Sequence, residues 1–152
     1  MPSTIINFIS QSIGDNIAFS PYADLYQEKY GGDVYVKTIL YQHFYSNNPN
    51  VFFVPIDFQK PGTIEKNVRF LFCDTPLQKI ICDQLDIEYI ELIPKIKIDP
   101  SIQFNKKKKY VCISVQSTTQ MKYWTAGGWD KVVNYIKTLG YDVYTIDQHE
   151  SF

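Results

Sequence analysis

The chain has 152 residues and a net charge of −1, and its composition is 45% hydrophobic and 20% charged. This balance excludes intrinsic disorder and is sufficient for the core of one or two small domains. The near-zero net charge gives no overall attraction to nucleic acid or to an anionic membrane, and no segment reaches the ~20 apolar residues of a membrane span.

The cysteines indicate a reducing compartment. Cys73, Cys82 and Cys112 are odd in number, form no CxxC pair, and lie far in sequence from both histidines. This spacing disfavours a disulfide framework or a metal site and favours buried thiols. The N-terminus also lacks the basic and apolar segments of a signal peptide. We therefore predict a cytoplasmic protein with no bound metal.

The first part of the chain alternates between strand and helix patterns. Residues 4–10 are β-branched and aromatic, which predicts a buried strand. Helical spacing then follows over 17–30, and Gly31 and Gly32 end that helix. Further strands are predicted at 33–39, 51–55 and 67–73, with a helix over 75–86 that has Thr75 as its N-cap and Pro76 at its first position. Such an α/β alternation is typical of a parallel sheet.

The second part begins after a change of composition. Two prolines and four consecutive lysines in 92–109 indicate an inter-domain linker, and the lysines are read as a solvated run or an anion patch. Beyond them a strand (110–117), a helix (127–140) and a strand (141–147) are predicted. The domains are thus 1–94, the linker 95–109, and 110–152, where we expect only the start of a second, incomplete Rossmann-like domain.

Asp15 is the first candidate site residue. It lies in "QSIGDNIAF", after the first predicted strand, and ligands of open α/β sheets bind at the carboxyl ends of the strands. A carboxylate there can take a proton from a substrate hydroxyl. The alternative is that Asp15 only caps a helix. Tyr22 is close enough in sequence to border the same cleft.

The second candidate site is the loop "QSTTQMKYW" at 116–124. Its hydroxyl-rich part is followed by Lys122 and by the start of a helix, a combination that suits a diphosphate. It is neither a Walker A loop nor a GxGxxG fingerprint. A solvated polar loop, with Trp124 packed on the sheet edge, explains the pattern equally well. The candidate donors of the loop are Ser117, Thr118, Thr119 and Lys122.

Two stretches together carry a family resemblance. "IGDNIAFSPYADLYQEKYGGDVYV" (13–36) and "YVCISVQSTTQMKYWTAGGWDKVVNYIKTLGYDVYTID" (110–147) resemble the ADP-heptose-using glycosyltransferases of family 9, the heptosyltransferases. Within that family they look most like the autotransporter strand-loop-strand O-heptosyltransferases. The likeness extends over nearly the whole chain, although 40–109 matches only in pattern.

The resemblance implies a GT-B architecture, in which two Rossmann-like domains face each other across a cleft. It implies that Asp15 is the general base for an acceptor hydroxyl on a protein or a glycan. It further implies that Lys122, with Ser117, Thr118 and Thr119, binds the diphosphate of an ADP-sugar and stabilises the departing ADP. Transfer would invert the anomeric carbon without a metal or other cofactor, and the chain has no DxD motif.

One expectation and two alternatives remain open from the sequence. The strands that hold the adenosine in the family have no counterpart here, so we expect a fragment that binds ADP-sugar weakly and turns over poorly or not at all. A non-catalytic α/β nucleotide-binding or assembly module would keep the fold with its cleft closed or filled. A flavodoxin-like protein would instead pair strands 4–10 and 110–117 within one sheet. The oligomeric state is not predicted.

Overall fold

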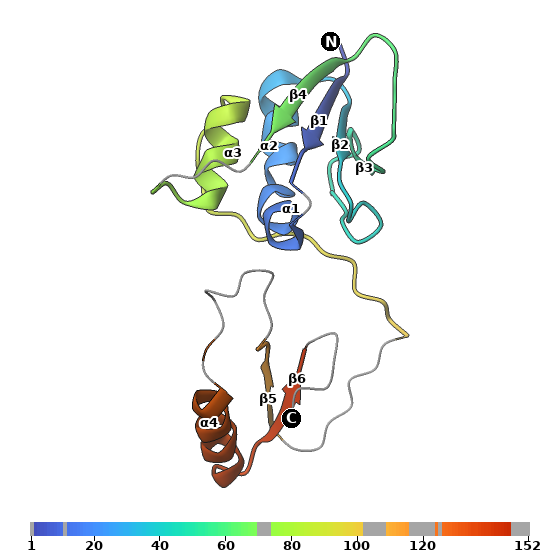
Figure 1. The fold of residues 1–152 in the computed structure, drawn as a ribbon. Helices are drawn as coiled ribbons and strands as arrows, with labels where there is room; N and C mark the ends of the chain where they lie inside the picture. Colours follow the sequence, from blue (N-terminus) through green and yellow to red (C-terminus); the bar gives the residue numbers. More distant parts are fainter. Residues whose placement is uncertain are drawn as a thin grey trace. The chain divides into compact units, whose positions relative to one another are not determined.

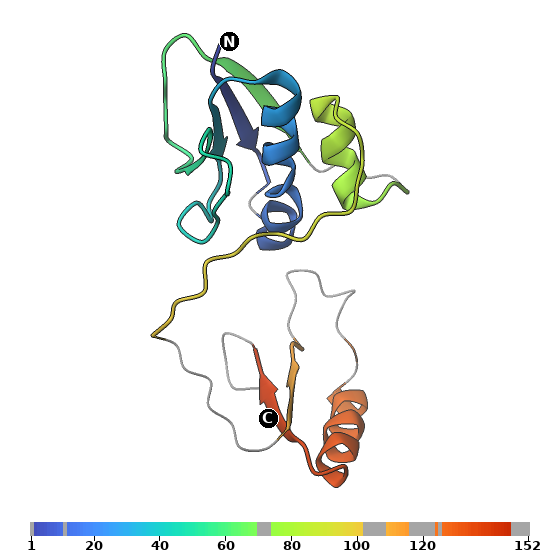
Figure 2. The same cartoon turned by 180° about the vertical axis from the view of Figure 1, so that it is seen from behind.

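The computed structural model describes residues 2–10, 12–69, 74–101, 109–115, 124 and 126–146. The chain divides into two compact units, Met1–Pro100 and Ser101–Phe152, and each unit has its own sheet (Figures 1 and 2). The boundary between the units falls within the segment 95–109.

The first unit is built on a four-stranded sheet of order β3-β2-β1-β4. All neighbouring strands are parallel, so the predicted α/β class with a parallel sheet is confirmed. In the register, Ile6 of β1 lies opposite Val36 of β2 and Lys66 of β4. The strands are β1 (Thr4–Phe8), β2 (Val34–Lys37), β3 (Val51–Val54) and β4 (Ile64–Val68).

Three helices cover one face of this sheet. Side chains alternate between the two faces of a strand, so Ile6 and Phe8 point to the same side as Val34 and Val36. These residues form one buried cluster with side chains of all three helices, such as Phe19. The helices are α1 (Ile13–Phe19), α2 (Tyr22–Tyr30) and α3 (Leu77–Leu85). Gly31 ends α2 with a φ of 67°, as its position in the sequence predicts.

The opposite face of the sheet is partly covered by the connection between β3 and β4. Tyr35 of β2 stacks on Phe52 of β3 and on Phe58 of the connection, with ring centroids 5.1 and 5.0 Å apart. Lys60 lies over the same ring, 4.3 Å from its centroid. Side chains of all three helices of this unit pack in the core cluster on the other face. On this face, the covering that the structure describes is therefore the connection between β3 and β4 with its aromatic stack.

Two predicted boundaries are wrong. The fourth strand is Ile64–Val68 instead of 67–73, and its first four residues are exposed. This strand lies at the sheet edge and its position follows from pairing with β1, so apolar content does not mark it. Residues 70–73 lie outside the described part of the chain. In α3, Pro76 is the N-cap with an extended ψ of 137°, so Thr75 is not the cap.

The second unit has the predicted strand–helix–strand order. Strand β5 (Tyr110–Ile113) pairs in parallel with β6 (Asp142–Thr145), and helix α4 (Ala126–Thr138) lies between them in sequence. Gly140, with a φ of 80°, follows the helix. Because β1 already has β2 and β4 as neighbours, it has no free side for β5, and the flavodoxin-like alternative is wrong for the described strands.

The two described cysteines differ in burial. Cys82 of α3 is a buried free thiol, as predicted, whereas Cys112 of β5 is exposed. The prediction for Cys112 is wrong because burial alternates along β5: Ile113 is buried, but Cys112 and Tyr110 point to the exposed face. Cys73 lies outside the described residues.

Candidate functional site

The candidate site lies where the strand order of the first sheet reverses. The chain runs from β1 to β2 and β3 on one side, and β4 lies on the other side of β1. Ligands of open α/β sheets bind beyond the carboxyl ends of the strands at such a reversal. Here the amide of Ile9 donates a 3.0 Å hydrogen bond to the carbonyl of Val68, which holds the ends of β1 and β4 together. Helix α1 begins just beyond this point (Figure 1).

Asp15 is a half-buried residue in the first turn of α1. The N-cap position belongs to Ser12, so the alternative that Asp15 caps the helix is wrong. One carboxylate oxygen, Oδ2, accepts a 2.5 Å hydrogen bond from the Ser10 hydroxyl. The structure therefore places a partly accessible carboxyl side chain at the reversal point.

Asn16, next to Asp15, is fully buried and was not predicted as a site residue. Its Nδ2 donates to the backbone carbonyls of Ser10 and Ser12, both at 2.8 Å. Its Oδ1 accepts a 2.5 Å hydrogen bond from Thr38, the buried residue just after β2. The sequence signal for this residue is its spacing, because Asn16 shares a helical stripe with the buried Phe19.

Tyr22 does not border this site, contrary to the sequence prediction. Its side chain is fully buried, and its hydroxyl donates a 2.9 Å hydrogen bond to the backbone carbonyl of Ile90. Burial raises the pKa of this hydroxyl from 10.0 to about 12. Tyr22 is thus a core residue that fastens the segment after α3 to α2.

The residues predicted to donate hydrogen bonds to the diphosphate lie outside the described residues. These are Ser117, Thr118, Thr119 and Lys122, which lie between β5 and α4 in sequence. Trp124, just before α4, is described. Its ring stands edge-on to Trp129 at 5.4 Å and lies so close to Gly128 that a Cβ there would be 2.6 Å from the indole. The described contacts of Trp124 are therefore with the start of the helix.

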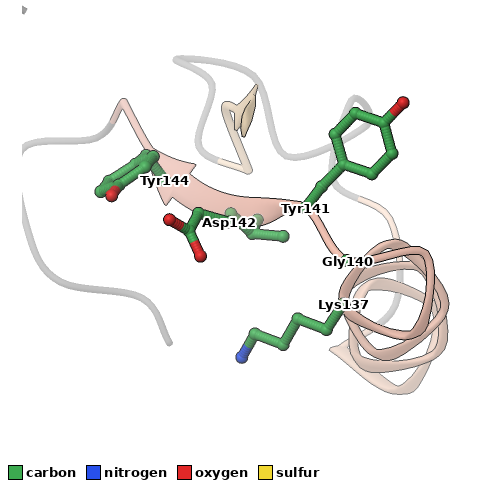
Figure 3. Close-up of a pocket in the computed structure, with 6 residues that line it drawn as sticks. Lys137, Gly140, Tyr141, Asp142 and Tyr144 are labelled. Atoms are coloured by element: carbon green, nitrogen blue, oxygen red, sulfur yellow. The ribbon is translucent and has the colours of Figure 1, made fainter. Parts of the chain in front are cut away.

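The second unit has a cavity of about 470 Å³ at the amino end of its sheet, whereas a diphosphate is expected at the carboxyl end. The cavity is lined by Lys137 in the last turn of α4, by Gly140 and Tyr141 after that helix, and by Asp142, Val143 and Tyr144 of β6. Figure 3 shows the Lys137 and Asp142 side chains extending to the same side, with the Tyr141 ring directed away from them. The loop after β5 follows the carboxyl end of the sheet, so this cavity is not part of the predicted donor site.

Within the described ranges, no group of three or more His, Cys, Asp or Glu side chains is arranged to hold a metal ion. In the same part of the chain, no helix is long and apolar enough to cross a membrane.

The parallel α/β fold of this chain is also found in a solved bacterial glycosyltransferase. The chain superimposes on the solved chain of TibC from enterotoxigenic E. coli H10407, described as a bacterial iron-containing dodecameric glycosyltransferase. The TM-score is 0.80 at 25% identity, covering 97% of this chain and 42% of the TibC chain. A second TibC structure, in complex with ADP-D-beta-D-heptose, gives a TM-score of 0.79 at 23% identity.

Sequence comparison leads to the same group of proteins. The chain is 34% identical over 124 residues, or 81% of its length, to the autotransporter heptosyltransferase Aah of Escherichia coli. It is also 34% identical over 95 residues to the autotransporter heptosyltransferase TibC of E. coli O78:H11. The predicted resemblance to the autotransporter heptosyltransferases is thus confirmed.

The matched region is only part of those relatives, and no protein-family model matches the chain. The chain covers 27% of Aah and 20% of TibC as curated sequences. The iron named for the solved TibC has no fitting ligand set among the described residues of this chain.

Proposed function

We propose that the chain acts in the transfer of a heptose-type sugar from an ADP-sugar to an acceptor hydroxyl, with Asp15 as the general base. The observation that carries the proposal is the position of Asp15 at the reversal point of a sheet that superimposes on a heptosyltransferase bound to ADP-heptose. The 34% identity with Aah over 124 residues supports the same activity.

The proposed reaction is a single displacement. Asp15 accepts the proton of the acceptor hydroxyl as that oxygen attacks the anomeric carbon of the sugar. The bond between the anomeric carbon and the diphosphate breaks, and its electron pair leaves with ADP. A displacement of this kind inverts the anomeric carbon and requires no metal. The acceptor is proposed to be a protein or glycan hydroxyl.

The donor side of the reaction is assigned to the loop before α4. Ser117, Thr118, Thr119 and Lys122 are proposed to bind the diphosphate and to stabilise the charge that develops on ADP. Support comes from α4 itself, a helix of 13 residues that begins shortly after this loop at Ala126. A helix N-terminus provides partial positive charge and free amides for a phosphate.

The proposed architecture is GT-B, with two Rossmann-like halves. Residues 1–94 would form the acceptor side, 95–109 the linker, and 110–152 the donor side. The order β3-β2-β1-β4 supports this, since it matches the first four strands of the doubly wound order 3-2-1-4-5-6. The cytoplasmic location remains a prediction from the cysteines.

Donor binding tests the assignment of Ser117, Thr118, Thr119 and Lys122 to the diphosphate. Thermal unfolding of the purified chain is measured with ADP-heptose, ADP and a UDP-sugar. We expect ADP-heptose and ADP to raise the melting temperature and the UDP-sugar to have no effect, because bound ligand stabilises the folded state. Lys122→Ala should remove the shift, whereas Lys131→Ala, at an exposed position of α4, should keep it. Equal shifts in both variants would contradict the donor assignment.

Transfer tests the role of Asp15. The chain, in excess over ADP-heptose, is incubated with a serine-containing acceptor peptide, and the heptose adduct is measured by mass spectrometry. Asp15→Asn should abolish the adduct while donor binding persists, and Asp57→Asn, at an exposed position, should not. ADP-heptose binding without any adduct in the unmodified chain would instead favour the non-catalytic module.

A further inference from the structure

A chain of hydrogen bonds runs from the buried pair Thr38 and Asn16 through the half-buried Ser10 to the carboxylate of Asp15. We infer that Ser10, Asn16 and Thr38 are positioning residues, which hold Asp15 in one side-chain orientation and leave its Oδ1 to take the acceptor proton. This inference rests on the proposed function of Asp15 as the base. It adds the groups that orient the base, none of which touches the reacting atoms.

Ser10 is the group in direct contact with the base. Its Oγ accepts a 3.1 Å hydrogen bond from the amide of Ser12. Because one lone pair faces that amide, the hydroxyl proton is free to point at Asp15 Oδ2, which lies 2.5 Å away. A hydrogen bond to a charged carboxylate is among the strong ones. Oδ2 is therefore engaged, and among the described residues no hydrogen bond occupies Oδ1, which is left for the acceptor hydroxyl.

Asn16 fixes the loop that carries Ser10. Its two amide protons are used by the carbonyls of Ser10 and Ser12, and its oxygen is used by the Thr38 hydroxyl. Only a side chain with two donors and an acceptor at this length satisfies all three partners. Asn16 is fully buried, so losing any of these bonds would leave a polar group without water as a substitute.

Thr38 connects this arrangement to the sheet. It is fully buried, and its amide donates a 3.2 Å hydrogen bond to Val54 O of β3. Its hydroxyl also accepts a 3.1 Å hydrogen bond from the amide of Leu40. Through Thr38, the orientation of Asp15 is thus fixed relative to the end of β2, a strand of the sheet, although Asp15 itself lies on a short helix.

The direct test is the side-chain conformation of Asp15 in the full chain. Nuclear magnetic resonance couplings between its Hα and Hβ protons distinguish one staggered rotamer from an average of several. We expect a single rotamer in the unmodified chain, an averaged pattern in Ser10→Ala, and a single rotamer again in Ser10→Thr, which keeps the hydroxyl. A single rotamer in Ser10→Ala would overturn the inference.

The far end of the network gives an independent test, which also covers the case that a Ser10 variant does not fold. Thr38→Val removes the hydroxyl at nearly constant shape, and Thr38→Ser keeps it. We expect averaged Asp15 couplings in Thr38→Val only. Identical couplings in both variants would overturn the part of the inference that concerns Thr38.

Transfer rates separate this inference from the proposed function. If Asp15 is the base, Ser10→Ala should lower the adduct-forming rate about tenfold at unchanged ADP-heptose affinity, and Ser10→Thr should restore it. Should Asp15→Asn leave transfer intact, the base assignment is wrong, while the couplings still decide whether Ser10 orients Asp15. An unchanged rate in Ser10→Ala beside a dead Asp15→Asn would overturn the positioning role.

Discussion

The hydroxyl of Tyr22 in α2 donates a 2.9 Å hydrogen bond to the backbone carbonyl of Ile90, 68 residues further along the chain. This bond attaches the extended segment after α3 to the helical layer. It also explains why a tyrosine is tolerated at a position with no exposure to solvent, since a buried hydroxyl needs a partner.

Removing that hydroxyl should weaken the first unit. Tyr22→Phe keeps the ring and leaves the Ile90 carbonyl without its partner, so we expect the free energy of unfolding in urea to fall by about 1 kcal/mol. Tyr45→Phe is the matched control, because Tyr45 is 42% exposed and should change little. Equal effects of the two changes would mean that the bond to Ile90 adds no stability.

Two buried groups that can lose a proton, the Tyr22 hydroxyl and the Cys82 thiol, predict a loss of folding stability at high pH. Burial raises the pKa of Tyr22 from 10.0 to about 12 and that of Cys82 from 9.0 to about 11. Each group prefers to stay protonated in the folded state, so its contribution is complete below its unfolded pKa. That contribution is lost as pH rises from 9 to 11 for Cys82 and from 10 to 12 for Tyr22.

The check is the unfolding free energy measured between pH 8 and roughly 12. Each group can contribute a slope of up to about 1.4 kcal/mol per pH unit within its window. Tyr22→Phe should flatten the upper part of the decline, and Cys82→Ala the lower part. If neither variant changes the slope, these two groups do not titrate as the burial argument requires.

Asn16 should matter far more for stability than its polar character suggests. Asn16→Ala leaves the carbonyls of Ser10 and Ser12 and the hydroxyl of Thr38 without their partner. We expect a loss of about 2–3 kcal/mol in the unfolding free energy. Asn47→Ala, at an exposed position, should stay within about 0.5 kcal/mol. Similar values for the two variants would contradict the buried network.

Two adjacent glycines in α4 should respond differently to the same change. A Cβ on Gly127 meets nothing within 4 Å, so Gly127→Ala should only strengthen the helix, by up to about 1 kcal/mol. A Cβ on Gly128 would lie 2.6 Å from the Trp124 indole, so Gly128→Ala must displace that ring from Trp129.

Near-ultraviolet circular dichroism reports this displacement, because the two indoles are 5.4 Å apart and edge-on. The signal of the pair should be lost in Gly128→Ala and retained in Gly127→Ala. Retention in both would show that the ring tolerates a methyl group at Gly128.

The elements that sequence analysis predicts correctly are those in which local signals and burial agree. The first strand, with Ile5, Ile6 and Phe8 buried, carries its signal in apolar residues. Gly31 marks the end of α2 because its φ of 67° is a conformation that favours glycine. Residues of the fourth strand carry no such signal: "IEKNV" is mostly polar, and only pairing with β1 makes it a strand.

The candidate site was predictable only in part. Sequence analysis identifies Asp15 because an acidic residue after a first strand is chemically distinctive. The residues that surround it in the fold are not distinctive in the sequence. Ser10, Asn16 and Thr38 come together through the tertiary fold, with Asn16 and Thr38 22 residues apart in sequence. Their hydrogen bonds depend on the ends of β1 and β2 being neighbours, which no local pattern specifies.

The central position of β1 has a consequence for how the first unit folds. Its two neighbours are β2 and β4, and its pairing with β4 joins residues 60 apart in sequence, such as Asn7 and Asn67. Such distant pairing is slow, because a long loop must close before the contacts reward it. During synthesis β1 therefore stays unpaired along one edge until β4 has left the ribosome, and in that interval its open backbone N–H and C=O groups can pair with another chain.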